Sequence, residues 1–143
     1  MSADGRRAKS LMFSGPARTW TARLLALSTG FYSAVLLYAT HYPKPEALLG
    51  RSLPSDKLLH LLAYGTLGLL AAATLWAYRG WTAGNVLRLA AALAVAGIFD
   101  EVTQPLFGRA ADPLDWVFDC LGLAAGILSF AALNSLASAL GNR

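Results

Sequence analysis

The chain has 143 residues, enough for one compact domain, and 56% of them are hydrophobic against 14% charged. Soluble globular chains average about 45–50% apolar and about 25% charged residues, so this composition excludes intrinsic disorder and disfavours a water-soluble globule. The single cysteine, Cys120, excludes an internal disulfide and a multi-cysteine zinc or iron–sulfur site.

Long apolar runs lie between the charged residues. Three of them, 24–43, 58–78 and 120–142, contain no formally charged side chain. Because a helix rises about 1.5 Å per residue, about 20 residues cross a hydrocarbon core of ~30 Å, so we predict three transmembrane helices. The first run is longer than the roughly 7–15 apolar residues of a signal peptide, and no small-x-small cleavage site follows it, so we expect a retained helix.

A fourth apolar run, 89–99, is too short to cross a membrane by itself. A span there has to include Arg88 at one end and Asp100 and Glu101 at the other. The long Arg88 side chain can extend to the interface, whereas a short acidic side chain is expected to face the bundle interior. The sequence thus predicts an all-α fold, a bundle of four transmembrane helices. Its expected parts are a basic tail at 1–19, spans at about 20–41, 57–79, 84–106 and 113–137, and a short tail at 138–143.

The basic residues predict the orientation of these spans. With an even number of spans both termini lie on one side, and eight of the twelve Lys and Arg residues fall on that side. Cytoplasmic segments carry the excess of Lys and Arg, so both termini are expected in the cytoplasm. The pI of about 9.6 then follows from topology. We therefore expect the lipid bilayer, and no nucleic acid, as a partner.

The acidic residues show the opposite bias. Seven of the eight Asp and Glu residues fall in the outer half of the predicted bundle or in its outer loops. Acidic side chains inside a membrane are costly and are therefore functional candidates. Asp56, His60 and Tyr64 are spaced four residues apart at the start of the second span, so they share one helix face.

The third span ends in polar residues at the same boundary. Asp100 and Gln104 share a face, and Glu101 points about 100° away from Asp100. Arg109 follows in the next loop. In an ordinary bundle these groups converge in one outer pocket, with Arg109 as the countercharge.

The fourth span starts with an acidic, glycine-lined face. Asp115 and Asp119 share this face, and it continues into Gly122 and Gly126. Such a small-xxx-small pair permits close approach of a neighbouring helix. The acidic end of this span is therefore expected to press against another helix.

Each of these residues also has a purely structural interpretation. Asp56 and Asp115 can cap helices, His60 can be a hydrogen-bonded bundle histidine, Tyr64 can be packing, and Arg109 can pair with an acid of the third span. No histidine pair, HExxH spacing, phosphate-binding loop, dinucleotide fingerprint or nucleophile elbow is present. We therefore expect no metal and no cofactor.

Two stretches together carry a combined motif. DKLLHLLAYGTLGLL at 56–70 and DEVTQPLFGRAADPLDWVFDCLGLAAG at 100–126 resemble the VanZ-like family of small bacterial membrane proteins, over about residues 55–130. The matched positions are Asp56, Lys57, His60, Tyr64, Asp100, Glu101, Gln104, Arg109, Asp115, Asp119 and Gly122. Asp119 stands where many relatives carry asparagine, and the span at 20–41 lies outside the pattern.

The resemblance implies a multi-pass protein of the bacterial inner membrane, from a family whose founding member is associated with low-level teicoplanin resistance. No substrate or reaction transfers with the motif. We favour a binding protein whose outer pocket engages a lipid headgroup, a lipid-linked cell-wall precursor or a partner membrane protein. The expected ligand-binding residues are Arg109, Gln104, Tyr64, Asp115 and Asp119.

Two other functions stay open. The chain can be an interfacial enzyme on a lipid-linked envelope intermediate, with His60 as general acid or base and Asp56 orienting it. Asp100 or Glu101 would then be a second acid or base, and Arg109 would hold a phosphate. Alternatively, the polar residues only lock the helices together. The sequence does not decide whether a reaction is catalysed, and it does not reveal the oligomeric state.

Overall fold

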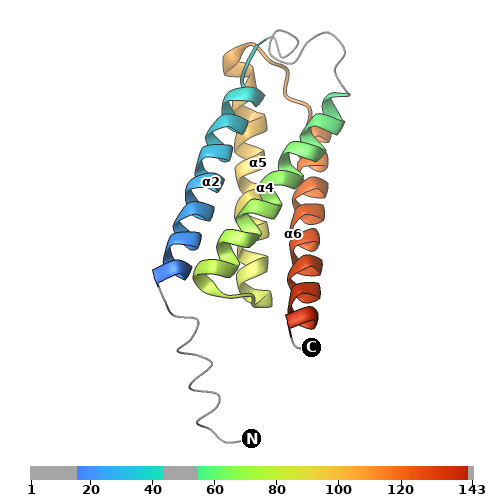
Figure 1. Cartoon of the computed structure of the whole chain (residues 1–143). Coiled ribbons are helices and arrows are strands. Elements are labelled where there is room, and N and C mark those ends of the chain that lie inside the picture. The colour runs from blue at the N-terminus through green and yellow to red at the C-terminus, as the bar shows by residue number, and fades with distance from the viewer. Residues whose placement is uncertain (1–15, 44–54, 142–143) are drawn as a thin grey trace, which may run out of the picture.

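The computed structural model describes residues 16–43 and 55–141, which form an all-α structure (Figure 1). Its helices are α2 (Pro16–Thr40), α4 (Asp56–Arg79), α5 (Ala83–Thr103), the short 3-10 helix η1 (Gln104–Phe107) and α6 (Pro113–Gly141). No strand occurs in these two ranges. The prediction of an all-α fold is therefore confirmed for the described part of the chain.

The four long helices lie side by side (Figure 1). The start of α2, the α4–α5 connection and the end of α6 lie at one end of the bundle. The end of α2, the start of α4, η1 and the start of α6 lie at the other, which we call the η1 end. Helix α4 contacts each of the other three long helices, most extensively α6.

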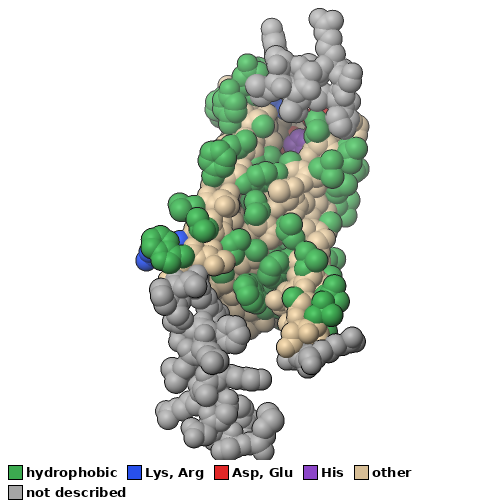
Figure 2. Space-filling model, in the orientation of Figure 1, with side chains coloured by type: hydrophobic (Ala, Val, Ile, Leu, Met, Phe, Trp, Pro, Cys, Tyr) green, Lys and Arg blue, Asp and Glu red, His purple; other side chains and the backbone are tan. Residues whose placement is uncertain are grey.

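Three helices are long and apolar enough to cross a membrane: Thr19–Thr40 in α2, Asp56–Arg79 and Pro113–Gly141. Large hydrophobic side chains cover their outer surfaces, as Figure 2 shows for one face. Phe31, for example, is 74% exposed. An outward-facing apolar surface of this extent is typical of a protein in contact with lipid.

The helix bounds differ from the predicted spans in three places. Helix α2 begins at Pro16, inside the tail that was expected at 1–19. The third span was expected to continue to about 106, but α5 ends at Thr103 and η1 follows. Pro105 explains this break, because it has no backbone N–H to donate to the carbonyl four residues earlier and its ring crowds that carbonyl. At the other end of the chain, residues 138–141 were expected in a tail but continue α6. Residues 1–15 of the predicted basic tail lie outside the described residues.

Helices α4 and α6 approach each other closely where both carry glycine. A Cβ atom built on Gly122 would collide with the backbone oxygen of Leu61, and one on Gly126 with the backbone oxygen of Gly65. Only glycine permits these backbone contacts. The expected close approach of the glycine-lined face of α6 is confirmed, and the neighbour is α4.

Candidate functional site

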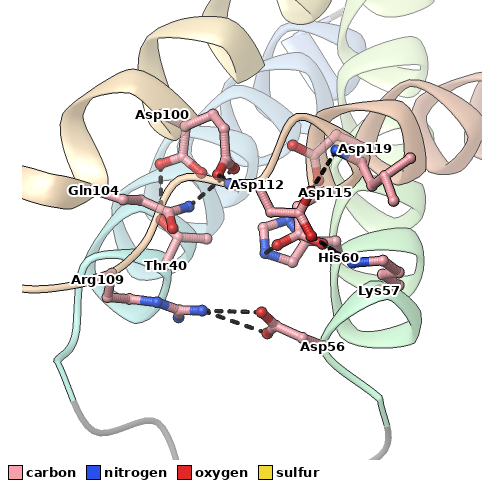
Figure 3. Close-up of polar contacts among 12 residues, drawn as sticks. Thr40, Asp56, Lys57, His60, Asp100, Gln104, Arg109, Asp112, Asp115 and Asp119 are labelled. Atoms are coloured by element: carbon pink, nitrogen blue, oxygen red, sulfur yellow. Dashed lines mark hydrogen bonds and ion pairs between the residues drawn. The ribbon is translucent and has the colours of Figure 1, made fainter.

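Polar side chains from all four long helices meet at the η1 end (Figure 3). We call this group the polar cluster. It consists of Thr40, Asp56, Lys57, His60, Tyr64, Asp100, Glu101, Gln104, Arg109, Asp112, Asp115 and Asp119. All nine residues that the sequence singled out lie within it. Tyr64 and seven other residues of the cluster are buried, and Gln104 and Asp119 are fully buried.

His60 lies between two acidic residues of α6. Its Nδ1 is 2.8 Å from Oδ1 of Asp119, and its Nε2 is 3.9 Å from Oδ2 of Asp115. A carboxylate can only accept, so the imidazole donates through Nδ1 and the short contact fixes the ring orientation. The residue expected to orient His60 was Asp56, whereas Asp119 makes this hydrogen bond. Asp119 takes this role because α6 presses against α4 one turn inside the η1 end.

Lys57 joins the start of α4 to the start of α6. Its ammonium donates to Asp112 at 2.7 Å and to Asp115 at 3.2 Å. Asp112 also accepts from the backbone N–H of Leu114 at 2.9 Å, so it caps α6. The Lys57 ammonium, followed by the Leu114 N–H, holds the pKa of the Asp112 carboxyl below its ordinary value.

The charge of Asp112 is expected to stabilise the protein only above acidic pH. A carboxyl whose pKa is lowered by folding stabilises the folded state above its unfolded pKa, about 3.9, and this contribution is lost as pH falls through the folded value. Asp112→Asn keeps an acceptor for the cap but removes the charge. The stability difference between wild type and this variant, followed by thermal unfolding from pH 7 downward, should disappear in acid. A difference that persists unchanged would contradict the assignment.

Arg109 contacts α4, not the third span. Its Nη2 lies 3.1 Å from Oδ2 of Asp56, and its side chain is only 12% exposed. The alternative of a pair with Asp100 or Glu101 is wrong, because both acids bind other groups. Asp56 is also not the cap of α4, since the side chain of Ser55 accepts from the N–H of Leu58.

Asp100 accepts hydrogen bonds from two helices. Tyr64 donates to Oδ2 at 2.9 Å, and Thr40 donates to Oδ1 at 2.7 Å. His41 follows on α2, with Nδ1 3.4 Å from Oδ1 of Asp100 and Nε2 2.8 Å from Oγ1 of Thr103. Thr40 and His41 were missed by the sequence analysis. Their signal was two polar residues in succession at the end of the first apolar run.

Glu101 and Gln104 close the cluster toward η1. Gln104 donates through Nε2 to Glu101 at 3.2 Å, and the other Glu101 oxygen accepts from the backbone N–H of Asp112. Two buried atoms of the cluster, Oε1 of Gln104 and Oδ2 of Asp119, have no partner among the described residues. Buried polar atoms are rarely left unpaired, so these two mark places where the network is incomplete.

Two hollows adjoin the cluster, one on each side of the end of α2. A cavity of about 130 Å³ is lined by Asp56, His60, Tyr64 and Arg109 together with Leu36, Ala39, Thr40, Leu59 and Ala63. A groove of about 610 Å³ lies between α2 and η1 and is mainly apolar, with Leu37, Tyr38, Leu106 and Phe107 on its walls. A small cavity that has the charged side chains of Asp56 and Arg109 on its wall and a larger apolar groove thus both adjoin the η1 end.

The cluster carries an excess of negative charge. Six carboxylates face only two permanent cations, Lys57 and Arg109. In the described part of the chain, no serine or cysteine side chain is hydrogen-bonded to His60. The arrangement suits the binding of a cationic group, or of an anion on Arg109, better than nucleophilic catalysis.

Compared with protein-family models, with curated proteins and with solved structures, the chain has no significant match in any of the three.

Proposed function

We propose that this chain is a VanZ-like protein of the bacterial inner membrane that binds the headgroup of an envelope lipid in the polar cluster. In this proposal all four long helices cross the membrane, both termini are cytoplasmic, and the η1 end lies at the outer boundary. The observation that carries the proposal is the cavity that Arg109, Asp56 and His60 help to line, together with an apolar groove at the same end of the bundle.

Arg109 is the group best placed to hold a phosphate. Its guanidinium is largely buried, yet its partner Asp56 has a side chain that is 47% exposed. A phosphate oxygen can therefore replace this half-exposed carboxylate, and guanidinium–phosphate pairs are often bidentate. The groove walls would hold the first part of a lipid tail against apolar side chains, as most ligand sites do with apolar groups.

Native mass spectrometry of gently extracted protein tests this function. Wild type is expected to retain a phospholipid or polyprenyl-phosphate species that Arg109→Ala loses, because the variant has no cation facing the cavity. Arg79→Ala is the matched control, since Arg79 ends α4 at the opposite end of the bundle. It should retain the same species as wild type.

Equal lipid profiles in all three proteins, with folding intact, would contradict the proposal. They would favour a cluster that only locks the helices together. The link to teicoplanin tolerance is part of the same proposal. It predicts that expression of wild type raises the tolerance of a susceptible host, and that Arg109→Ala does not.

An interfacial enzyme is the second candidate. The observation that favours it is the hydrogen bond from His60 to Asp119, since an oriented imidazole can act as a general acid or base. Turnover of the retained lipid that is lost in His60→Ala would support this function. Absence of turnover across candidate lipids would count against it.

A further inference from the structure

We propose that Asp56, His60 and Asp115 bind a divalent transition-metal ion. One ligand atom from each of the three side chains lies within 4.8 Å of the other two. Figure 3 shows them together where the starts of α4 and α6 meet. Small side-chain movements would place all three ligand atoms about 2.0–2.2 Å from one central ion, the distance at which Zn²⁺ binds nitrogen and oxygen ligands.

His60 is presented as a metal ligand. Its side chain is 4% exposed, and Nδ1 is committed to Asp119. Nε2 then carries the lone pair, and no hydrogen bond reaches it from residues 16–43 or 55–141; Asp115 at 3.9 Å is beyond that range. Metal-binding histidines almost always donate their other ring N–H to a carboxylate or carbonyl. The buried His60 ring thus places a nitrogen within 4.8 Å of a carboxylate oxygen of Asp56 and of Asp115.

Both carboxylates have an oxygen to offer. Lys57 contacts Oδ1 of Asp115, which leaves Oδ2, the oxygen nearer to Nε2 of His60. Arg109 makes its shorter contact with Oδ2 of Asp56, at 3.1 Å, and is 3.5 Å from Oδ1. Asp56 and His60 also line the 130 Å³ cavity, which gives an ion a path to the site.

The ligand set indicates the class of ion. One imidazole and two carboxylates suit Zn²⁺ or Mn²⁺ better than Ca²⁺ or Mg²⁺, which take oxygen ligands. A divalent ion would also offset part of the excess negative charge of the cluster. Three protein ligands leave a coordination position open, and we assign it to a phosphate oxygen of the headgroup; this last step rests on the proposed function.

Calorimetric titration of the chelator-treated full chain in lipid nanodiscs, with Zn²⁺ and with Mn²⁺, tests the site. We expect one ion per chain. Loss of a hydrogen bond that supports a metal ligand lowers metal affinity by about 10–100-fold. His60→Gln and Asp115→Asn remove a ligand itself, so each should weaken binding by more than this. Asp56→Asn should weaken binding too. Because the Asp56 side chain is half-exposed, this substitution should leave the fold intact, so weaker binding would report on the site itself.

Two substitutions serve as matched controls. His41→Gln removes the other histidine of the chain, and Cys120→Ala removes its single thiol, so neither should change the affinity. Electron spin-echo spectroscopy of bound Mn²⁺ should show coupling to one imidazole nitrogen. Absence of saturable binding, or binding that only the controls weaken, would overturn the site.

The lipid measurement separates this inference from the proposed function. Lipid that depends on Arg109 but is retained without any metal binding would overturn the metal site and leave the function standing. Metal binding that depends on His60, without any retained lipid, would overturn the function and leave the metal site standing.

Discussion

Gly126→Ala is expected to destabilise the bundle by about 1–3 kcal/mol, because the added methyl group has no space. Its Cβ would collide with the backbone oxygen of Gly65 and lie 2.7 Å from the backbone nitrogen of Leu69. Backbone atoms within a helix cannot yield as a flexible side chain can. Helices α4 and α6 would have to separate, and the hydrogen bond between His60 and Asp119 would lengthen with them. Reversible unfolding in detergent micelles measures the change.

Gly30→Ala is the matched control. Gly30 lies inside α2, and a Cβ there meets nothing within 4 Å. Alanine is favoured over glycine within a helix by roughly 0.5–1 kcal/mol, so this variant should be neutral or slightly more stable. Equal losses in the two variants would contradict a close contact between α4 and α6. A loss confined to Gly126→Ala would support it.

Three uncharged runs were sufficient to predict α2, α4 and α6, because a membrane-spanning helix needs about 20 apolar residues and charges mark the ends. The shorter run at 89–99 predicted α5 only when its charged flanks were included. The break at Gln104–Phe107 depends on a single proline within an otherwise helical pattern. Such a proline can kink, end or open a helix. The sequence therefore predicted the position of α5 in the chain well, but not the residue at which it ends.

Helical periodicity also predicted which residues share a face. Asp56, His60 and Tyr64 lie on α4 with four-residue spacing, and the glycines of α6 continue the face of Asp115 and Asp119. These relations are local to one helix, so spacing determines them.

The partners across helices could not be predicted in this way. Arg109 follows Glu101 by only a few residues, which suggested an ion pair between them, yet Arg109 contacts Asp56 in α4. Thr40 binds Asp100, sixty positions away in the chain. Such pairs depend on how the helices are rotated and on the path of the loop after η1. Neither property has a signal in the spacing of one helix.

Asp119→Leu and His60→Leu are each expected to destabilise the protein strongly. The double variant is expected to lose less stability than the sum of the two single losses. Asp119→Leu leaves the Nδ1–H of His60 buried without an acceptor, which costs about 1–3 kcal/mol. His60→Leu leaves a carboxylate with 0% exposure and no partner on either oxygen, a loss of roughly 3–5 kcal/mol if the pair is ionic. The double variant has neither unpaired group. It should therefore be less destabilised than the sum of the single variants by about 1–3 kcal/mol.

Two further variants serve as controls for this double-mutant cycle. Asp119→Asn keeps an acceptor for His60, so it should cost much less than Asp119→Leu. Thr29→Val alters a hydrogen bond between Thr29 and Thr74, away from the cluster. Combined with Asp119→Leu it should be additive within about 0.3–0.5 kcal/mol. Additivity in the His60 pair as well would mean that the two side chains do not share a hydrogen bond. A stable double variant that no longer binds Zn²⁺ or lipid would separate what the pair does for the fold from what the cluster does for a ligand.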